Sequence, residues 1–318
     1  MNRIFLGALL TICLAAAPAH AWNRAGHMVT GAIAYQVLKQ DKDEKTIAKA
    51  VALLKKHPDF PRWDKMAQKL NEDERDLFLF MQAARWADDA RDNPKFYPLD
   101  QQNDKLHYIN FPFTPKGQPD SVKTAPPDEK NILRGFTDKR SVLIGKGDDA
   151  ERAVALSWIA HLVGDVHQPL HTTSLFTTQF QYEGGKLIGD RGATRFYIRA
   201  TEGSEPISLH KFWDDLIIGS DGFQDVRNKA TALRLRKDFA KEKLTELAVV
   251  EFEQWAVKES LPLAKEVVYR EGKLEGGSKK SDAPTLPADY AKTVQPIAER
   301  RAVLAGYRLA AVLRQALE

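Results

Sequence analysis

Cysteine is almost absent from this sequence of 318 residues, and the single one, Cys13, lies within the first 21. Those residues have a short cationic start, an apolar run from Ile4 to about Ala17, and a closing Ala19-His20-Ala21. This three-part pattern is typical of a secretory signal peptide with an A-x-A cleavage site. We therefore expect residues 1–21 to be removed and Trp22 to become the first residue of an exported chain without thiols.

The other absences narrow the possible functions. Without cysteine after residue 21, the exported chain has no disulfide scaffold, no thiolate-ligated metal site and no thiol nucleophile. The remaining apolar runs are too short to cross a bilayer, so we expect no stable membrane association. The net charge of only +4 argues against a protein that coats nucleic acid non-specifically. An exported chain without disulfides favours a bacterial protein that is periplasmic or secreted.

The apolar residues that are present follow a helical pattern. They recur at intervals of three and four, as at Val29, Ile33 and Val37, and this spacing predicts helices. Further helices are expected around Ile47–Leu54 and near residues 73–91, 128–145, 150–166, 208–218, 238–269 and 290–317. The sequence therefore predicts a mainly α fold.

Three segments break the helical pattern. Residues 109–127, 174–207 and 270–288 are rich in proline or glycine and are expected to be loops. Within the second, Thr194–Arg199 has strand-forming residues that favour a small β-hairpin. None of these loops separates enough helices for two cores, so we predict a single domain over residues 22–318.

The densest chemical signal is the segment from Trp158 to His171, which holds three histidines and one aspartate. Residues Ala153–Val163 are apolar nearly all round, which predicts a buried helix, and His161 and Asp165 lie four apart on one face of it. A buried carboxylate requires a partner. That partner is either the histidine alone, in a structural ion pair, or a divalent metal bound by both groups.

A second pair favours the metal. His210 and Asp214 repeat the same spacing on another apolar segment, flanked by Leu209, Phe212 and Trp213. Two such pairs are difficult to explain as coincidental ion pairs. Imidazole and carboxylate ligands without thiolates suit zinc, with manganese or iron as less favoured occupants. His27, His107 and the adjacent Asp88 and Asp89 could join these pairs, although each alone is also compatible with an ordinary structural role.

Six short motifs follow one another along the chain. They are Trp22 followed by Gly26-His27, Trp86-Ala87-Asp88, His107 to Asn110, His161 to His171, Leu209 to Asp214, and Ala305 to Ala310. Together they resemble the exported zinc-dependent nucleases of the S1/P1 family, which cleave single-stranded nucleic acid and also act as 3′-nucleotidases. The resemblance extends over most of the chain after residue 21 and implies a multi-helical domain of the phospholipase C and S1/P1 nuclease type.

The resemblance also implies three Zn²⁺ ions per chain and assigns their ligands. One zinc would be held by Asp88, His107, His161 and Asp165, and its close neighbour by His27, Asp165 and the α-amino nitrogen and carbonyl oxygen of Trp22. A third, more distant zinc would be held by His171, His210 and Asp214. The α-amine of Trp22 is available only after the signal peptide is removed. His167 and Asp89 match no ligand position.

The implied activity is endonucleolytic hydrolysis of single-stranded DNA and RNA to 5′-phosphorylated products, together with hydrolysis of 3′-nucleotides. Asp88 and Asp165 would serve catalysis through the metals. Arg91 matches a basic position that contacts phosphate, Tyr108 a position that stacks a base, and Asn110 would lie near the base edge. No protein partner is implied.

One departure and two alternatives remain. Where the family has Gly-Gly-Asn, this chain has Gly192-Ala193-Thr194, which leaves the nucleotide preference open. Zinc-dependent phospholipase C resembles the family, but it has a longer interval than that between Trp22 and His27, and a glutamate where this chain has Asp214. A non-enzymatic exported zinc-binding protein would explain the ligands but not the neighbouring Arg91 and Tyr108.

Overall fold

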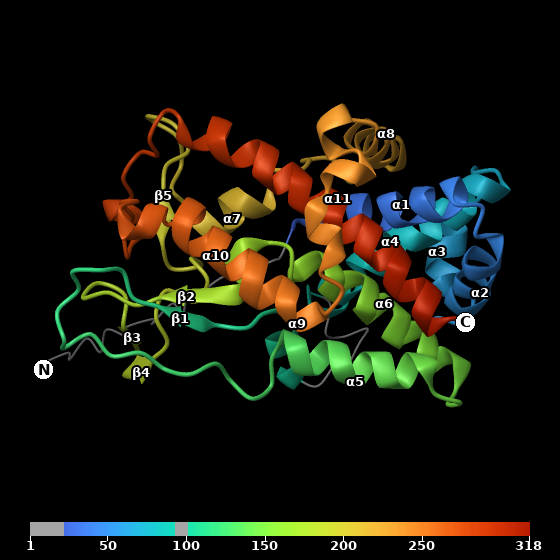
Figure 1. Cartoon of the computed structure of the whole chain (residues 1–318), viewed down its shortest axis with the longest axis horizontal. Coiled ribbons are helices and arrows are strands. Elements are labelled where there is room, and N and C mark those ends of the chain that lie inside the picture. The colour runs from blue at the N-terminus through green and yellow to red at the C-terminus, as the bar shows by residue number, and fades with distance from the viewer. Residues whose placement is uncertain (1–21, 93–100) are drawn as a thin grey trace, which may run out of the picture.

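Helix α1 (Arg24–Gln40) is enclosed by the other long helices, as the computed structural model shows for residues 22–92 and 101–318 (Figure 1). Thirteen of its 17 residues are buried, because α4, α6, α8 and α11 all contact it. The Asn23 side chain caps its first turn by accepting a hydrogen bond from the backbone of Gly26. The predicted signal peptide lies outside the described residues.

The first half of the chain is helical where helices were predicted, and it also has short helices at residues 60–66 and 101–107 that were not predicted. After α1 come α2 (Glu44–Leu54), α3 (Phe60–Met66), α4 (Glu72–Asp92), the short 3-10 helix η1 (Gln101–His107), α5 (Ile132–Ile144) and α6 (Asp149–Asp165). Twelve of the 17 residues of α6 are buried, which confirms the prediction that this apolar segment is an interior helix. Helix α6 lies against both α4 and α5, and its last two turns carry His161 and Asp165.

The second half follows the predictions less closely. It contains η2 (Pro169–Thr172), α7 (Leu209–Asp214), α8 (Phe223–Arg234), the 3-10 turns η3 (Lys237–Phe239), η4 (Lys241–Lys243) and η5 (Thr245–Ala248), a continuous helix made of α9 (Phe252–Gln254), η6 (Trp255–Ser260), α10 (Leu261–Leu263) and η7 (Ala264–Val268), the turns η8 (Arg270–Gly272) and η9 (Lys280–Asp282), and α11 (Tyr290–Ala316). The long C-terminal helix α11 is confirmed. Helix α7 is shorter than the predicted 208–218.

The sequence analysis missed one helix in this half and misplaced the start of another. Helix α8 was missed because only Val226, Ala230 and Leu233 of its 12 residues are buried, so its apolar stripe is narrow. The predicted helix over 238–269 begins only at Phe252, since the preceding residues form separate 3-10 turns. Segments η6 and η7 have π-helical hydrogen bonding, and Pro262 between them lacks the amide hydrogen that a regular helix would use.

Three short strand pairs lie within the segments predicted as loops. Strand β1 (Phe111–Phe113) pairs in parallel with β2 (Thr173–Leu175), while β3 (Tyr182–Glu183) pairs with β4 (Lys186–Leu187) and β5 (Tyr197–Ile198) with β6 (Ile207–Ser208), both antiparallel. The β5–β6 pair confirms the predicted hairpin. The β1–β2 pair has a larger consequence, because it holds the segment that follows His107 beside the segment that follows His171.

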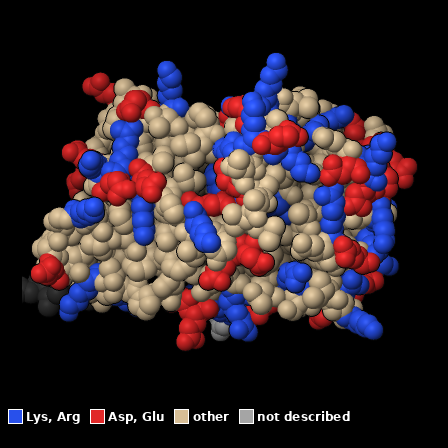
Figure 2. All heavy atoms as spheres, in the orientation of Figure 1, with Lys and Arg blue, Asp and Glu red and all other residues tan. Residues whose placement is uncertain are grey.

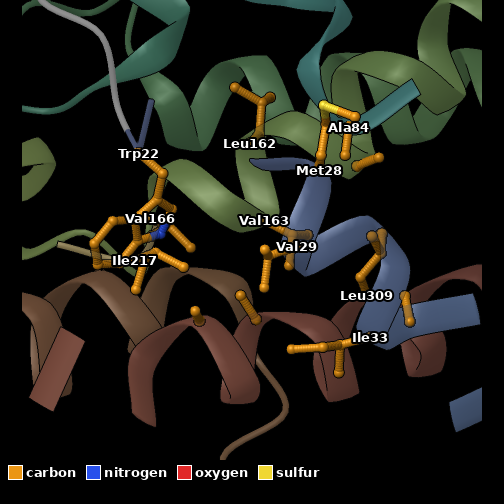
Figure 3. Packing of buried hydrophobic residues seen from close by; sticks show 14 of the residues in the cluster. Trp22, Met28, Val29, Ile33, Ala84, Leu162, Val163, Val166, Ile217 and Leu309 are labelled. Atoms are coloured by element: carbon orange, nitrogen blue, oxygen red, sulfur yellow. The ribbon is translucent and has the colours of Figure 1, made fainter. Parts of the chain in front are cut away.

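The core fixes α1 against α6 and α11. Figure 3 shows Val29 of α1 facing Val163 of α6, and Ile33 of α1 close to Leu309 of α11. The indole of Trp22 is fully buried near Val166. Each fully buried side chain of this size contributes about 1.5–3 kcal/mol to folding, so the contacts hold α1 firmly against the helix that carries His161 and Asp165.

The surface agrees with the small net charge. On the face drawn in Figure 2, basic and acidic side chains intermingle. Over residues 22–92 and 101–318, no helix is long and apolar enough to cross a membrane.

Candidate metal centre

Three clusters of buried histidine and aspartate side chains lie at one end of α6 and around it. They are His27, His161 and Asp165; Asp88, His107 and His161; and His171, His210 and Asp214. Within each cluster the candidate ligand atoms lie within 4.8 Å of one another. The residues come from α1, α4, η1, α6, η2 and α7, so the structure brings together all eight side chains predicted as ligands.

Asp165 occupies the middle of the first two clusters. Its Oδ1 lies 3.2 Å from Nε2 of His27, whereas its Oδ2 lies 3.1 Å from Nδ1 of His107 and 3.2 Å from Nε2 of His161. The two oxygens thus face different histidines, which is the arrangement a bridging carboxylate needs. His161 also approaches Asp88, with 3.7 Å between Nε2 and Oδ1, and is within reach of both clusters.

Backbone carbonyl groups orient three of the rings. Nδ1 of His161 donates to Ala84 O at 2.8 Å, Nδ1 of His171 to His107 O at 2.8 Å, and Nδ1 of His210 to Gly192 O at 2.5 Å. A carbonyl oxygen only accepts, so each Nδ1 carries a hydrogen and each ring directs its Nε2 into its cluster.

This orientation creates repulsion that a cation would remove. Nε2 of His171 and Nε2 of His210 lie 3.1 Å apart, so two neutral rings would place lone pairs face to face. Within the described chain, Nδ1 of the buried His27 has no hydrogen-bond partner, and the approach of its Nε2 to Oδ1 of Asp165 at 3.2 Å does not have the geometry of a hydrogen bond. Buried polar atoms are normally satisfied. A divalent metal in each cluster would supply the missing partner.

The electrostatics agree with this interpretation. Burial, reinforced by repulsion from His161, lowers the pKa of His27 to about 4, and burial also lowers the pKa values of His107 and His171. These rings are therefore neutral near pH 7, which is the form that binds metals. Burial raises the pKa of Asp214 well above its ordinary value, as expected for a carboxylate without a cation beside it. Neutral imidazoles with carboxylates fit a zinc site.

A comparison of the sequence with models of protein families identifies the family. The sequence model of the S1/P1 nuclease family matches residues 22–318. The chain belongs to the S1/P1 nuclease family. This confirms the resemblance carried by the sequence motifs.

Curated relatives of this S1/P1 family member are similar over part of their length. Endonuclease 4 of Arabidopsis thaliana is 30% identical over 172 residues, which is 51% of this chain and 50% of that protein. Endonuclease 3 of the same plant is 28% identical over 172 residues and Endonuclease 5 is 27% identical over 173, with the same coverage. The chain therefore spans about half the length of the curated relatives it matches.

The N-terminal segment of this S1/P1 family member is attached to the third cluster. The backbone amide of Asn23 donates to Asp214 O at 3.1 Å, and its side-chain amide donates to Ile218 O at 2.8 Å. The side chain of Trp22 is 0% exposed. The residue expected to become the new N-terminus is thus held in place beside α7.

A pocket opens beside the third cluster. It is lined by Arg91, Asp104, Tyr108, Asn110, Leu170, His171, Arg191, Thr194 and His210. The three predicted substrate contacts, Arg91, Tyr108 and Asn110, therefore share one cavity with two of the proposed ligands. Arg91 Nη2 also lies 2.8 Å from Oδ1 of Asp88, so its guanidinium links the pocket to the close clusters.

Sequence reasoning assigned no role to several side chains that support the site. Gln168 lies within a recognised motif, and its side-chain amide donates to Oδ1 of Asp214 at 2.8 Å. Asp104, Arg191 and Thr194 line the pocket, although only the position of Thr194 was singled out, as a departure from the family. His167 lies outside the three clusters, where its Nδ1 donates to Val163 O at 2.7 Å.

Gly164 allows α1 to approach α6 at the close clusters. A Cβ atom at this position would lie 2.6 Å from Nδ1 of His27, which is too close for any real contact. We expect Gly164→Ala to displace His27, to reduce the divalent metal bound per chain, and to lower the free energy of unfolding by about 1–3 kcal/mol. Metal analysis and urea denaturation would measure both effects.

Helix propensity makes this prediction specific. Alanine is a better helix former than glycine by about 1 kcal/mol, so without the contact to His27 the Gly164→Ala variant would be more stable. Gly219→Ala, in the loop between α7 and α8, controls for the added methyl group alone, since a Cβ there would meet nothing within 4 Å. Full metal content and raised stability in Gly164→Ala would contradict the role assigned to this contact.

Asp190 controls the loop that supports His210. It is fully buried, Oδ1 accepts from Leu175 N at 2.9 Å, and Oδ2 accepts from the Tyr269 hydroxyl at 2.6 Å. Burial raises the pKa of Asp190 to about 6 from an ordinary value of 3.8. The folded chain thus holds this proton more tightly than the unfolded chain, and the resulting stability is complete below about pH 4 and lost as the pH rises through about 6.

Asp190→Asn should therefore change the pH dependence of folding. Asparagine imitates the protonated acid but cannot ionise, so we expect its stability relative to the unsubstituted protein to improve by roughly 2–3 kcal/mol between pH 4 and pH 7. Urea denaturation of both proteins across this range, at equal zinc concentration, measures the difference. Parallel pH profiles would show that Asp190 ionises as freely in the folded chain as in the unfolded one.

Proposed function

We propose that this chain is an exported zinc-dependent endonuclease that hydrolyses phosphodiester bonds of single-stranded DNA and RNA to 5′-phosphorylated products and also hydrolyses 3′-nucleotides. The observation that carries the proposal is the shared cavity, in which a stacking aromatic and an arginine lie beside histidines directed at one another. Membership of the S1/P1 family supports the hydrolytic chemistry.

Three zinc ions fit the three clusters. The proposed ligands are Asp88, His107, His161 and Asp165 for one ion; His27, Asp165 and Trp22 for its neighbour; and His171, His210 and Asp214 for the third. Bound zinc would supply Lewis acidity and lower the pKa of a water molecule towards 7. Three divalent ions carry more positive charge than Asp88, Asp165 and Asp214 neutralise, so the centre would attract phosphate.

The side chains of the chain itself would then position the substrate. Arg91 presents its guanidinium to the pocket and would bind a non-bridging phosphate oxygen, a contact in which the planar group can donate two parallel hydrogen bonds. Burial raises the pKa of Tyr108, which keeps its phenol neutral near pH 7. Its ring would stack on one base, while Asn110 would lie at the base edge.

The pocket supports the proposed preference for single strands. Stacking on an aromatic ring is tolerant of sequence and worth about 1–3 kcal/mol per base. A base in a duplex already has both faces stacked and its edge paired, so it cannot enter a pocket that takes one base at a time. Tyr108 is half-buried, which suits a base that enters from solvent.

The location of the protein is part of the proposal. The signal peptide pattern of residues 1–21 would direct export, and the absence of cysteine after it fits a bacterial periplasmic or secreted protein. Removal of the peptide would leave the α-amine of Trp22 as a ligand. Processing would thus complete one zinc site.

A substrate panel tests the proposed activity. The zinc-loaded protein is incubated with single-stranded DNA, single-stranded RNA, 3′-AMP and phosphatidylcholine, and the products are separated and counted. We expect turnover of the first three and no release of phosphocholine. Hydrolysis of phosphatidylcholine alone would identify a phospholipase C, and three bound zincs with no turnover of any substrate would identify a zinc-binding protein.

The role of Trp22 has its own test. A form with one extra residue before Trp22 has an amide in place of the α-amine, so we expect it to bind one zinc fewer and to lose at least about 100-fold in activity on single-stranded DNA. The control is the same form trimmed back to Trp22 by a protease, which should regain both. Full zinc content and activity in the extended form would refute the α-amine ligand.

A further inference from the structure

The turn before Thr194 has an unusual backbone. Arg191, Gly192 and Ala193 have φ values of 56°, 61° and 63°, so three consecutive residues are left-handed and two of them carry side chains. Such conformations persist only where the surroundings impose them, and they gather at functional sites. The sequence pattern gave Arg191 no role.

Contacts on both sides impose this conformation. The Arg191 amide donates to Ser174 Oγ at 3.0 Å, and Gly192 O accepts from the ring of His210. A Cβ on Gly192 would lie 2.4 Å from Leu170 O, so the turn lies flat against the segment that leads to His171. The backbone of the turn is therefore held by its contacts with the site, and this sets the point from which the Arg191 side chain leaves the backbone.

That side chain lies at the rim of the pocket. Arg191 lines the cavity together with Tyr108 and Thr194, and it is close enough to Tyr108 for its charge to act on the phenol. Its side chain is 49% exposed, and its ion pair with Glu183 is long at 3.6 Å. An exposed pair of this kind contributes little, so exchanging it for a phosphate costs little.

The two arginines of the pocket occupy different depths. The Arg91 side chain is only 11% exposed and lies 2.8 Å from Asp88, beside the proposed metals. Arg191 is at the solvent side of the same cavity. The nucleic acid chain on either side of a nucleotide bound in the cavity must pass out of it there. A guanidinium placed there suits a backbone phosphate, because its planar donors match phosphate oxygens.

We propose that Arg191 binds the backbone phosphate of a nucleotide next to the one whose base stacks on Tyr108. It is a specificity-determining residue that favours oligonucleotides over 3′-mononucleotides, which have no second phosphate to offer. This inference rests on the proposed nuclease function and deepens it.

The test compares Arg191→Gln with Arg134→Gln, a substitution of the same charge at an exposed arginine of α5 whose side chain is 66% exposed. Kinetics are measured on 3′-AMP and on a single-stranded oligodeoxynucleotide. In Arg191→Gln we expect the KM for the oligonucleotide to rise about 5- to 10-fold with kcat unchanged, and both constants for 3′-AMP to stay within about twofold. Arg134→Gln should change neither substrate, and Arg191→Lys should recover part of the loss.

A binding measurement separates this inference from the catalytic one. The zinc-loaded proteins are titrated with a labelled single-stranded oligonucleotide whose methylenephosphonate linkages resist hydrolysis, at several salt concentrations. Arg191→Gln should weaken binding and reduce the slope of log Kd against log salt by about 0.7, the value for one phosphate contact on a single strand. If the unsubstituted protein binds the oligonucleotide but cleaves no substrate, the nuclease proposal fails. The salt slope of Arg191→Gln then still decides whether Arg191 contacts a phosphate.

Two results would overturn the inference. An unchanged slope and Kd in Arg191→Gln would show that no phosphate contacts this side chain. Equal losses on 3′-AMP and on the oligonucleotide would show that the substitution acts through the Gly192 contact to His210, and thus on the metal centre.

Discussion

The burial of Asp165 is the constraint on which the site depends. Burial by itself raises the pKa of this carboxyl group, but His161, His107 and His27 outweigh that effect and hold it well below its ordinary value. The group is therefore ionised inside the core, and its charge must be balanced by a protonated ring or by a metal. The pKa of His161 is raised because Asp165 and Asp88 overcome its burial, so a proton takes the place of a cation when none is bound. Metal binding and folding are coupled for this reason.

Backbone contacts connect the close clusters to the third one. His171 donates to His107 O, and Ile109 N donates back to His171 O at 2.8 Å, so the two motif segments are joined before β1 and β2 pair. On the other side, Gln168 and Asn23 both contact Asp214. The distance between the clusters is thus set by these hydrogen bonds and by the short stretches of chain that connect the ligands. We therefore expect a displacement of one cluster to shift the other.

The sequence predicted those features that local spacing determines. The helices over 73–91, 150–166 and 290–317 were found because their apolar residues recur regularly, and the histidine–aspartate pairs because they lie four apart on such helices. Helix α8 has too few buried residues to be recognised, and β1 and β2 are short strands whose partners lie about 60 residues apart in the sequence. Arg191 and Gln168 reach the site because of the way the loops fold, and the spacing of residues in the sequence does not predict how a loop folds.

The metal centre and the pocket are built from different parts of the chain, and this bears on how substrate preference can vary. Most proposed ligands lie on the helices α1, α4, α6 and α7, whereas Tyr108, Arg191 and Thr194 lie on loops. The loops are not independent, because Gly192 O orients His210. Backbone changes at this turn would therefore disturb the third cluster, and so would a larger side chain at the buried Ala193. Thr194 is different, because its side chain lines the pocket whereas the contact to His210 comes from the backbone of Gly192, so a change of side chain at position 194 alters what the pocket offers a nucleotide.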